Sequence, residues 1–289
     1  MPNLNELKNR AGGVRSTRQV THAMYLISAS KSKRAKLQLD AVQPFFDRVE
    51  RTIAEILAAR GAPAADSPFT ERRDSVKRSL CFAVGGDKGM AGGYNHNLIR
   101  FMEERIDKAG TDVLMAGFMG RSRAERAGFS LDPEFRFPVM NPNLIRARDI
   151  ADILIERYLT GKYREAFIIC TRMDSAIKQE PMLIPLLPLT PEQFADVSET
   201  QVKKYDSIQY EPGPAEVFDS LTPHYVKGIV YAALVEAYTS EQHARMLAMD
   251  SATKSADDII SDLSLRYNRA RQAMITQEIT EIVSGIPTE

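Results

Sequence analysis

The C-terminal stretch from Met246 to Glu281 decides the fold, and it reads MLAMDSATKSADDIISDLSLRYNRARQAMITQEITE. Along it, mostly apolar positions recur in alternating steps of three and four residues, which is the pattern of a coiled-coil seam. The positions are Met246, Met249, Thr253, Ala256, Ile260, Leu263, Tyr267, Ala270, Met274, Gln277 and Glu281. Because no glycine interrupts the chain between Gly228 and Gly285, we expect one helix of roughly 60 residues, about 90 Å long.

The N-terminal zone is the second long helical segment. Between Leu4 and Arg60 it contains one proline, Pro44, and its only glycines are Gly12 and Gly13. Apolar side chains again recur three and four residues apart, which predicts a helix with one apolar stripe. They are Leu4, Leu7, Ala11, Val14, Val20, Ala23, Met24, Ile27, Phe45, Phe46, Val49, Ile53, Ile56 and Leu57. Since so long a helix needs a partner, we expect residues 1–60 and 215–289 to form a long antiparallel two-helix coiled coil.

The middle of the chain, residues 76–214, has a different periodicity. Compact apolar runs suit buried strands, and they occur at Leu80–Val84, Val113–Gly117 and Glu165–Thr171. A further run, Met182–Leu189, contains Pro185 and Pro188 and is expected to be an edge strand at best. Helical stretches lie between the runs, near Asn95–Lys108, Gly120–Ala127 and Leu144–Thr160. Strands that alternate with helices predict the α/β class, so we expect a Rossmann-like α/β domain inserted between the two long helices.

Composition excludes several classes of protein. The 289 residues are 44% hydrophobic and 26% charged, which is typical of a globular chain. The 38 basic and 38 acidic residues cancel, whereas a general nucleic-acid coat protein would be strongly basic. The longest apolar run, Ile229–Val235, is too short to span a bilayer, and the first residues do not resemble a secretory leader. Cys81 and Cys170 lie in apolar runs, which indicates two reduced core cysteines rather than a disulfide framework.

No motif points to catalysis. The segment Gly85–Asn95, GGDKGMAGGYN, follows a predicted strand and opens a predicted helix, where phosphates often bind. It lacks the G-x-G-x-x-G spacing, and Lys88 is followed by Gly89 rather than by serine or threonine, so a structural loop is expected. The four histidines, His22, His96, His224 and His243, have no metal-type partner at helical spacing. We therefore expect a protein that is not an enzyme by itself and holds no cofactor or metal.

Charge is distributed unevenly between the two ends. Residues 1–40 carry eight lysines and arginines against Glu6 and Asp40, while residues 246–289 carry four basic against seven acidic residues. The basic residues of the first segment are Lys8, Arg10, Arg15, Arg18, Lys31, Lys33, Arg34 and Lys36. Part of this asymmetry suits attraction between the two helices. The excess positive charge is left for something outside, such as acidic protein loops, nucleic acid or anionic lipid.

Several longer segments carry a resemblance to a known family. They are Val20–Lys31, Asp87–Asn95, Leu186–Leu189, Ser240–Met249 and Tyr267–Val283. With these segments the whole chain resembles the gamma subunit of F-type ATP synthases. That resemblance implies a central rotor stalk whose terminal helices sit inside a ring of alpha and beta subunits. It also implies an inserted foot domain that docks with the epsilon subunit on the c-subunit ring, peripheral to the membrane and not inserted in it.

The resemblance also implies roles for individual residues. Met24 matches a family methionine near a beta-subunit loop, and Lys31, Lys33 and Arg34 match cations that face acidic beta-subunit loops. On the C-terminal helix, the residues that match contacts to a beta-subunit catch loop are Arg271 and Gln272, with Thr276 and Glu278 following one to two turns on. Tyr210 and Glu211 match a stretch near the c ring. Catalytic, cofactor and metal residues are not implied.

The sequence departs from the family pattern at two places. Gly85 and Gly86 stand where hydroxyl residues usually precede the loop aspartate, and His22 stands where lysine is common. With no leader segment recognised, the resemblance implies a proton-translocating enzyme at the cytoplasmic face of a bacterial plasma membrane. Two other functions remain open from the residues alone: a nucleotide-dependent α/β enzyme with a coiled-coil arm, and a coiled coil that binds nucleic acid through its basic first helix.

Overall fold

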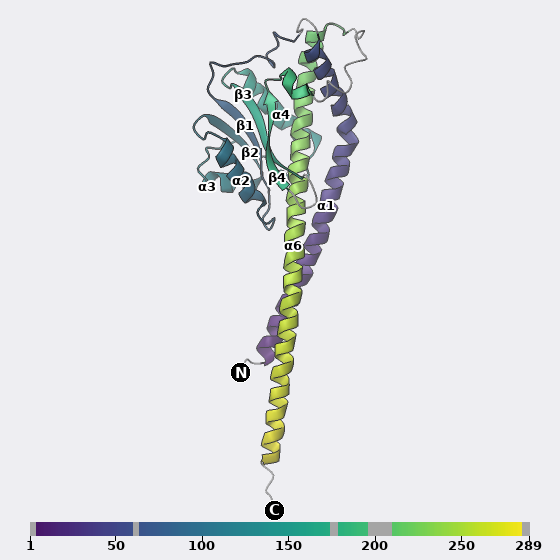
Figure 1. Ribbon diagram of the computed structural model, residues 1–289, viewed down its shortest axis with the longest axis vertical. Helices are drawn as coiled ribbons and strands as arrows, with labels where there is room; N and C mark the ends of the chain where they lie inside the picture. The colour runs from purple at the N-terminus through teal and green to yellow at the C-terminus, as the bar shows by residue number, and fades with distance from the viewer. Residues whose placement is uncertain (1–3, 60–63, 174–178, 196–209, 285–289) are drawn as a thin grey trace, which may run out of the picture. The chain divides into compact units, whose positions relative to one another are not determined.

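The computed structural model describes residues 4–59, 64–173, 179–195 and 210–284, with side chains up to residue 280 (Figure 1). Along the chain, a long helix precedes the sheet domain and another follows it: α1 spans Leu4–Ala58 and α6 spans Pro214–Ser284. The chain divides into two compact units, Met1–Ala29 with Arg245–Glu289, and Ser30–Ala244. Each unit is described below by itself.

The two long helices pack together in an antiparallel sense, as the sequence predicts. In the first unit, Leu7 and Ala11 of α1 share a core cluster with Leu263 of α6, whereas Thr21, further along α1, contacts Thr253. In the second unit, Gly228 faces Phe46, and a Cβ at Gly228 would lie 2.4 Å from Phe46 Cδ1. Residue numbers in α6 therefore fall as those in α1 rise. With 71 residues, α6 is longer than the roughly 60 expected from its spacing.

The buried stripe of α1 follows the prediction at most positions, but Val20, Ala23, Ile27 and Phe45 are exposed. Val20 and Ile27, placed in the stripe by their apolar character, are 58% and 53% exposed. The buried and half-buried positions instead keep strict steps of four and three. Within the first unit they are Leu7, Ala11, Val14, Arg18, Thr21, Tyr25 and Ser28, and within the second they are Ser32, Ala35, Leu39, Val42, Phe46, Val49, Ile53 and Ile56. The prediction was wrong here because the seam carries polar residues at that level, so hydrophobicity alone marks the wrong face.

Polar residues in the seam of the first unit satisfy one another. The hydroxyl oxygens of Thr21 and Thr253 lie 2.7 Å apart, and the Thr253 hydroxyl also lies 2.8 Å from the Met249 carbonyl oxygen. Since each hydroxyl has one proton, Thr21 can donate to Thr253 while Thr253 donates to the Met249 carbonyl. Next to this pair, Arg18 forms an ion pair with Asp257 across the two helices. The predicted attraction between the two helices therefore includes at least this specific contact.

A four-stranded sheet forms the centre of the second unit, in the order β2-β1-β3-β4. The strands are β1 (Ser79–Val84), β2 (Thr111–Ala116), β3 (Glu165–Met173) and β4 (Gln179–Leu187). Strand β1 pairs in parallel with both β2 and β3, whereas β4 runs antiparallel to β3 at the edge. The α/β class and the edge position of the proline-containing strand are confirmed.

The faces of the sheet are covered by different elements. On one face, Cys81, Ala83 and Ile169 pack with α2 (Tyr94–Arg105) and α3 (Phe118–Arg126) (Figure 1). On the other face, Leu80 and Phe82 belong to a larger core cluster with α4 (Leu144–Leu159) and the parts of α1 and α6 in this unit. Alternate residues of one strand point to opposite faces, so a sheet buried on both sides needs the continuous apolar runs seen in the sequence.

The glycine-rich loop after β1 is held by the protein's own groups. The Asp87 carboxylate accepts hydrogen bonds from the backbone N–H groups of Phe118 at 3.1 Å and Val139 at 2.8 Å, and from that of Met140. The Glu241 carboxylate of α6, which is buried, accepts from the N–H groups of Asp87 and Lys88. These contacts fit the structural loop that the sequence predicts.

Candidate functional site

Three groups of residues and one single residue, Met24, are candidates for contacts with partners. The first group is cationic. Lys31, Lys33 and Arg34 are all exposed on α1, on either side of the seam position Ser32. None of the three forms an ion pair with another residue in the described part of the chain. The structure thus shows three exposed cations, and their contact with a partner stays a prediction.

Met24 lies on the part of α1 that belongs to the first unit and is half-buried. It is one turn from Thr21, whose hydroxyl contacts Thr253 of α6. Its neighbour Tyr25 is half-buried at a seam position, and Ser28 is buried. Part of the Met24 side chain is thus packed and part is open to contact, which agrees with a position at the margin of the seam.

The second candidate group, Tyr210 and Glu211, precedes α6. The Tyr210 hydroxyl donates a hydrogen bond to Glu55 Oε2 of α1 at 3.2 Å. Burial and the neighbouring Glu55 carboxylate raise the pKa of this hydroxyl, so it stays protonated and able to donate. Glu211 is exposed. The structure therefore separates the two: Tyr210 ties the start of α6 to α1, while Glu211 faces outward.

The third group lies near the C-terminal end of α6. Arg271, Gln272, Thr276 and Glu278 are exposed, as are all residues from 271 to 280. The Thr276 hydroxyl donates to the backbone carbonyl oxygen of Gln272 at 2.9 Å. This contact does not involve the side-chain amide of Gln272. A ten-residue exposed surface on one helix offers both a cation and amides to a partner.

The predicted seam of α6 is confirmed from Met246 to Ala270. Each predicted seam residue in this range is buried or half-buried. It does not continue to Met274, which is 46% exposed, or to Gln277, which is exposed. Leu263 packs against Leu7 near the start of α1, so α6 has little of α1 left to contact beyond Ala270. The predicted seam position Glu281 lies where side chains are not described.

Exposed apolar residues form a group that sequence reasoning missed. On α6 they are Met274, Ile275 and Ile279, and on the part of α1 in the first unit they are Val20, Leu26 and Ile27. Scattered exposed hydrophobes are normal, but runs of them on one helix often mark contacts. Val20, Ile27 and Met274 are predicted to lie in buried stripes, whereas Leu26, Ile275 and Ile279 lie outside the predicted apolar positions.

Other chemistry has little support among the described residues. They contain no group of three or more His, Cys, Asp or Glu side chains placed to hold a metal ion. Cys81 and Cys170 are free and fully buried, and burial raises the pKa of both thiols, which makes them unreactive. No helix within the described ranges is both long and apolar enough to cross a membrane.

Comparison with known proteins identifies the family. The model of the ATP synthase family matches residues 3–288. The ATP synthase gamma chain of Acetivibrio thermocellus is 43% identical over 292 residues, covering 99% of this chain and 98% of that protein. That of Ruminiclostridium cellulolyticum is 43% identical over 288 residues, with 98% and 97% covered. The ATP synthase gamma chain, sodium ion specific, of Acetobacterium woodii is 35% identical over 297 residues, with 98% and 97% covered.

Solved structures share the fold at lower identity. A chain of the Euglena gracilis mitochondrial ATP synthase, OSCP/F1/c-ring in rotational state 3, matches with a TM-score of 0.64 at 14% identity, covering 97% of this chain and 92% of that one. A chain of the Tetrahymena thermophila mitochondrial ATP synthase central stalk and c ring matches with a TM-score of 0.56 at 22% identity, covering 81% and 99%. The chain belongs to the ATP synthase gamma family: it is a gamma subunit, the non-catalytic central-stalk rotor subunit of ATP synthase.

Proposed function

We propose that this chain couples rotation of a membrane c ring to conformational change at the beta-subunit catalytic sites of a proton-translocating F-type ATP synthase. The observation that carries the proposal is the exposed stretch 271–280 of α6, which has polar and apolar side chains but lies beyond the last seam residue, Ala270. A single helix has no three-fold symmetry. Inside a ring of three beta subunits it presents a different face to each of them.

Coupling follows from differential contacts. Each beta subunit exchanges between open and closed states, and a rotor contact that favours one state shifts that population by its difference in free energy. As the rotor turns, the favoured state passes from one beta subunit to the next. The reciprocal effect also holds: nucleotide binding that favours one state of a beta subunit favours one rotor angle.

The partners we propose are the alpha and beta subunits of the catalytic ring, the epsilon subunit and the c ring. Residues 76–214 would form the foot that meets epsilon and the c ring, with Tyr210 and Glu211 near the latter. The solved relatives are described with F1 and a c ring, which supports this assignment. The bacterial origin of the curated relatives supports a peripheral position at the cytoplasmic face of the plasma membrane.

Family membership contradicts the first alternative, a free-standing nucleotide-dependent enzyme, because gamma chains are non-catalytic. Family membership also argues against the second alternative, in which the basic surface of α1 binds nucleic acid. We propose acidic beta-subunit loops instead, because a carboxylate-rich loop and an exposed row of cations attract one another across a narrow gap.

The coupling ion is tested in membrane vesicles that contain the whole complex. We expect ATP to drive acidification of the vesicle interior at the same rate with and without added sodium. Addition of a protonophore should abolish the gradient and release hydrolysis from its restraint. Hydrolysis that requires sodium, together with sodium uptake that resists protonophores, would replace the proton proposal with the sodium coupling named for the Acetobacterium woodii relative.

The cationic row on α1 gives one prediction. Replacing Lys31, Lys33 and Arg34 together with alanine should slow ATP turnover of the complex roughly threefold, while each single change has little effect, because exposed ion pairs contribute about 0–1 kcal/mol each. ATP hydrolysis is measured between low and high salt. Salt should slow the parent toward the triple variant, since screening weakens the same contacts. Unchanged turnover and coupling in the triple variant would contradict the role given to these cations.

Met24 gives a second prediction. Met24→Lys should uncouple hydrolysis from ion pumping more than it destabilises the chain. Because Met24 is only half-buried, a lysine there can extend its ammonium group to solvent or to an acidic beta-subunit residue. That added contact would hold one rotor angle too tightly. Assembled complex with near-normal hydrolysis and poor pumping is the expected result, and Met24→Leu is the control. Loss of the assembled complex in Met24→Lys would count against the proposal.

A further inference from the structure

The segment Ala64–Arg73, which connects α1 to β1, contacts three other elements of its unit. The Ser67 hydroxyl donates a hydrogen bond to Asp219 Oδ1 of α6 at 2.5 Å. The Phe69 carbonyl oxygen accepts one from the Leu189 N–H, just after β4, at 2.7 Å. Arg73 Nη1 donates to the Tyr158 carbonyl oxygen near the end of α4 at 2.6 Å. The segment therefore bridges α6, the sheet edge and α4.

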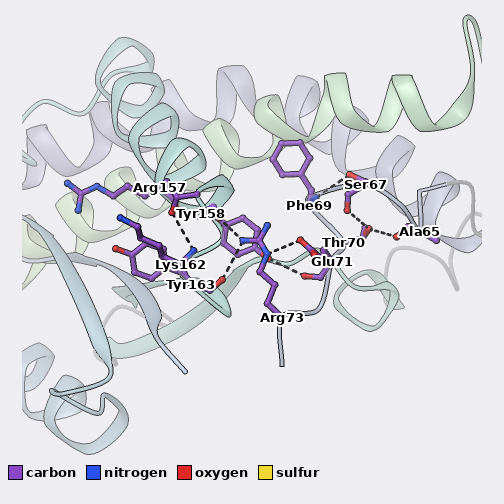
Figure 2. Close-up of polar contacts among 11 residues, drawn as sticks. Ala65, Ser67, Phe69, Thr70, Glu71, Arg73, Arg157, Tyr158, Lys162 and Tyr163 are labelled. Atoms are coloured by element: carbon purple, nitrogen blue, oxygen red, sulfur yellow. Dashed lines mark hydrogen bonds and ion pairs between the residues drawn. The ribbon is translucent and has the colours of Figure 1, made fainter. Parts of the chain in front are cut away.

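Arg73 is the most enclosed cation of this segment, with a side chain only 9% exposed (Figure 2). Its guanidinium carbon lies 4.4 Å from the centre of the Tyr158 ring, and its Nε donates to Glu71 Oε2 at 2.9 Å. A second carbonyl, that of Tyr163 at the start of β3, lies 3.5 Å from Nη1. A cation buried to this extent is stable only when it is paired, and here a carboxylate, a ring face and carbonyl oxygens share that task.

The segment itself is braced by local hydrogen bonds. The Thr70 hydroxyl donates to the Ala64 carbonyl oxygen at 2.7 Å, and the backbone N–H of Thr70 donates to the Ser67 carbonyl oxygen at 3.1 Å. Figure 2 shows how Ser67, Phe69 and Thr70 lie in this segment. The Phe69 N–H donates to the Ser67 hydroxyl oxygen, and the Phe69 ring is buried in the core cluster. Consecutive turns of this kind leave few soft dihedral angles. These turns brace Ala64–Thr70, and the Arg73 side chain is tied back to Glu71 at the end of that stretch.

Directional contacts have a separate mechanical value at this position. The sheet domain packs against α6 through apolar side chains of one core cluster and through direct hydrogen bonds, from the Ser240 hydroxyl to the Thr171 carbonyl oxygen, from the Tyr94 hydroxyl to the Ala237 carbonyl oxygen and from Gln179 to the Ser240 carbonyl oxygen. Apolar packing opposes separation but is non-directional, whereas a hydrogen bond fixes the relative orientation of the two groups that it joins. Another described polar link between α4 and α6 is an ion pair, in which Lys227 Nζ of α6 lies 3.1 Å from Asp152 Oδ1 of α4. The Asp152 side chain is 54% exposed. The buried Arg73 contacts are better protected from water and salt.

We infer that Arg73 and Ser67 are positioning residues that carry torque from the α/β sheet domain to α6. The inference rests on the proposed function, since torque enters through the foot only if the chain is driven by a c ring. The path runs from the Tyr158 carbonyl through Arg73, along the braced segment to Ser67, and across to Asp219 on α6. A rotor without this path keeps the direct contacts of β3, β4 and α2 with α6, so it would still fold and turn, but it would yield more under load.

The test uses the whole complex in membrane vesicles and compares hydrolysis without load with pumping under load. Arg73→Met keeps length and apolar bulk while removing the charge and all donors. With a protonophore present, hydrolysis should equal that of the parent. Without it, protons pumped per ATP hydrolysed should fall roughly threefold, as expected when a directional charged contact that acts only under load is lost. Arg73→Lys keeps the cation over Tyr158 and should restore part of the ratio. Arg148→Met, at an exposed α4 arginine paired with Asp149, is the control.

The outcomes separate the inference from its premise. An unchanged pumping ratio in Arg73→Met overturns the inference, and so does a proportional loss of loaded and unloaded activity, which indicates only a smaller amount of folded complex. If Arg73→Met does not assemble, Ser67→Ala combined with Asp219→Ala removes the other end of the path at an exposed helix position, and the same ratio decides. A parent complex that pumps nothing under any condition would refute the proposed function instead.

Discussion

Gly117→Ala should lower the free energy of unfolding of the sheet-containing unit by about 3 kcal/mol or more, the sum of backbone strain and a steric clash. Gly117 lies between β2 and α3 with φ at +92°, a conformation that residues with a Cβ rarely adopt. A Cβ at this position would also lie 2.4 Å from the Gly85 carbonyl oxygen. Both atoms belong to rigid backbone, so neither can move aside cheaply. Chemical denaturation of the purified chain measures the loss.

Two other glycines serve as controls for Gly117→Ala. Gly128 has φ at +83° but open space around its Cβ position, so Gly128→Ala isolates the strain and should cost about 1 kcal/mol. Gly12 lies within α1 and also has open space, so Gly12→Ala should stabilise the chain by about 0.5–1 kcal/mol through helix propensity. Equal losses for Gly117→Ala and Gly128→Ala would show that the close approach to Gly85 has no energetic weight.

The close approach of the two turns also involves Gly85 and Gly86. Gly85 stands where a hydroxyl residue is usual, and a Cβ on it would lie 2.7 Å from the Gly120 Cα. Its neighbour Gly86 uses backbone groups in place of a side chain: its carbonyl oxygen accepts hydrogen bonds from the N–H groups of Met119 and Gly120, both at 3.0 Å. The two backbone turns are therefore in direct contact.

Hydrophobic spacing predicted the fold well wherever the buried residues are apolar. The seam of α6 from Met246 to Ala270 and the strands of the sheet were found in this way, because their core positions are filled by apolar side chains. The same reasoning failed on α1 between Arg18 and Ser32, where polar residues occupy the seam and apolar ones lie outside it. A pattern of apolar residues identifies a buried face only if the buried face is apolar.

The candidate site could be predicted in part. Exposure of the cations on α1 and of Arg271 on α6 follows from helical spacing and charge. The role of Arg73 could not be predicted, since it depends on carbonyl groups at Tyr158 and Tyr163, 85 and 90 residues further along the chain. Backbone carbonyls carry no signature in a sequence. A buried arginine therefore looks like any surface arginine until the fold brings its partners together.

Replacing Arg271 and Gln272 together with leucine should reduce ATP synthesis by the whole complex about tenfold, the effect of losing one charge-assisted hydrogen bond of roughly 1.5 kcal/mol. Both residues are exposed on α6 beyond the last seam residue. Adjacent residues project about 100° apart around a helix, so the two side chains cannot face the same direction. A guanidinium can form a forked bond to a carboxylate or to loop carbonyls of one beta subunit, and the amide of Gln272 can add a second contact. Such contacts form at one rotor angle and break at the next.

The measurement must separate this role from a loss of folding. Leucine is as good a helix former as arginine, so circular dichroism of the isolated double variant should match the parent. Arg266→Leu is the control, because Arg266 lies on the same helix but already has a partner, with its Nε 2.9 Å from Asp262 Oδ2. We expect the control to assemble and synthesise ATP normally, and Arg271→Leu alone to account for most of the loss. If the double variant assembles and synthesises ATP at the parental rate, Arg271 and Gln272 do not hold the rotor in register with a beta subunit. The contact must then be sought among the exposed apolar residues of the same helix, Met274, Ile275 and Ile279.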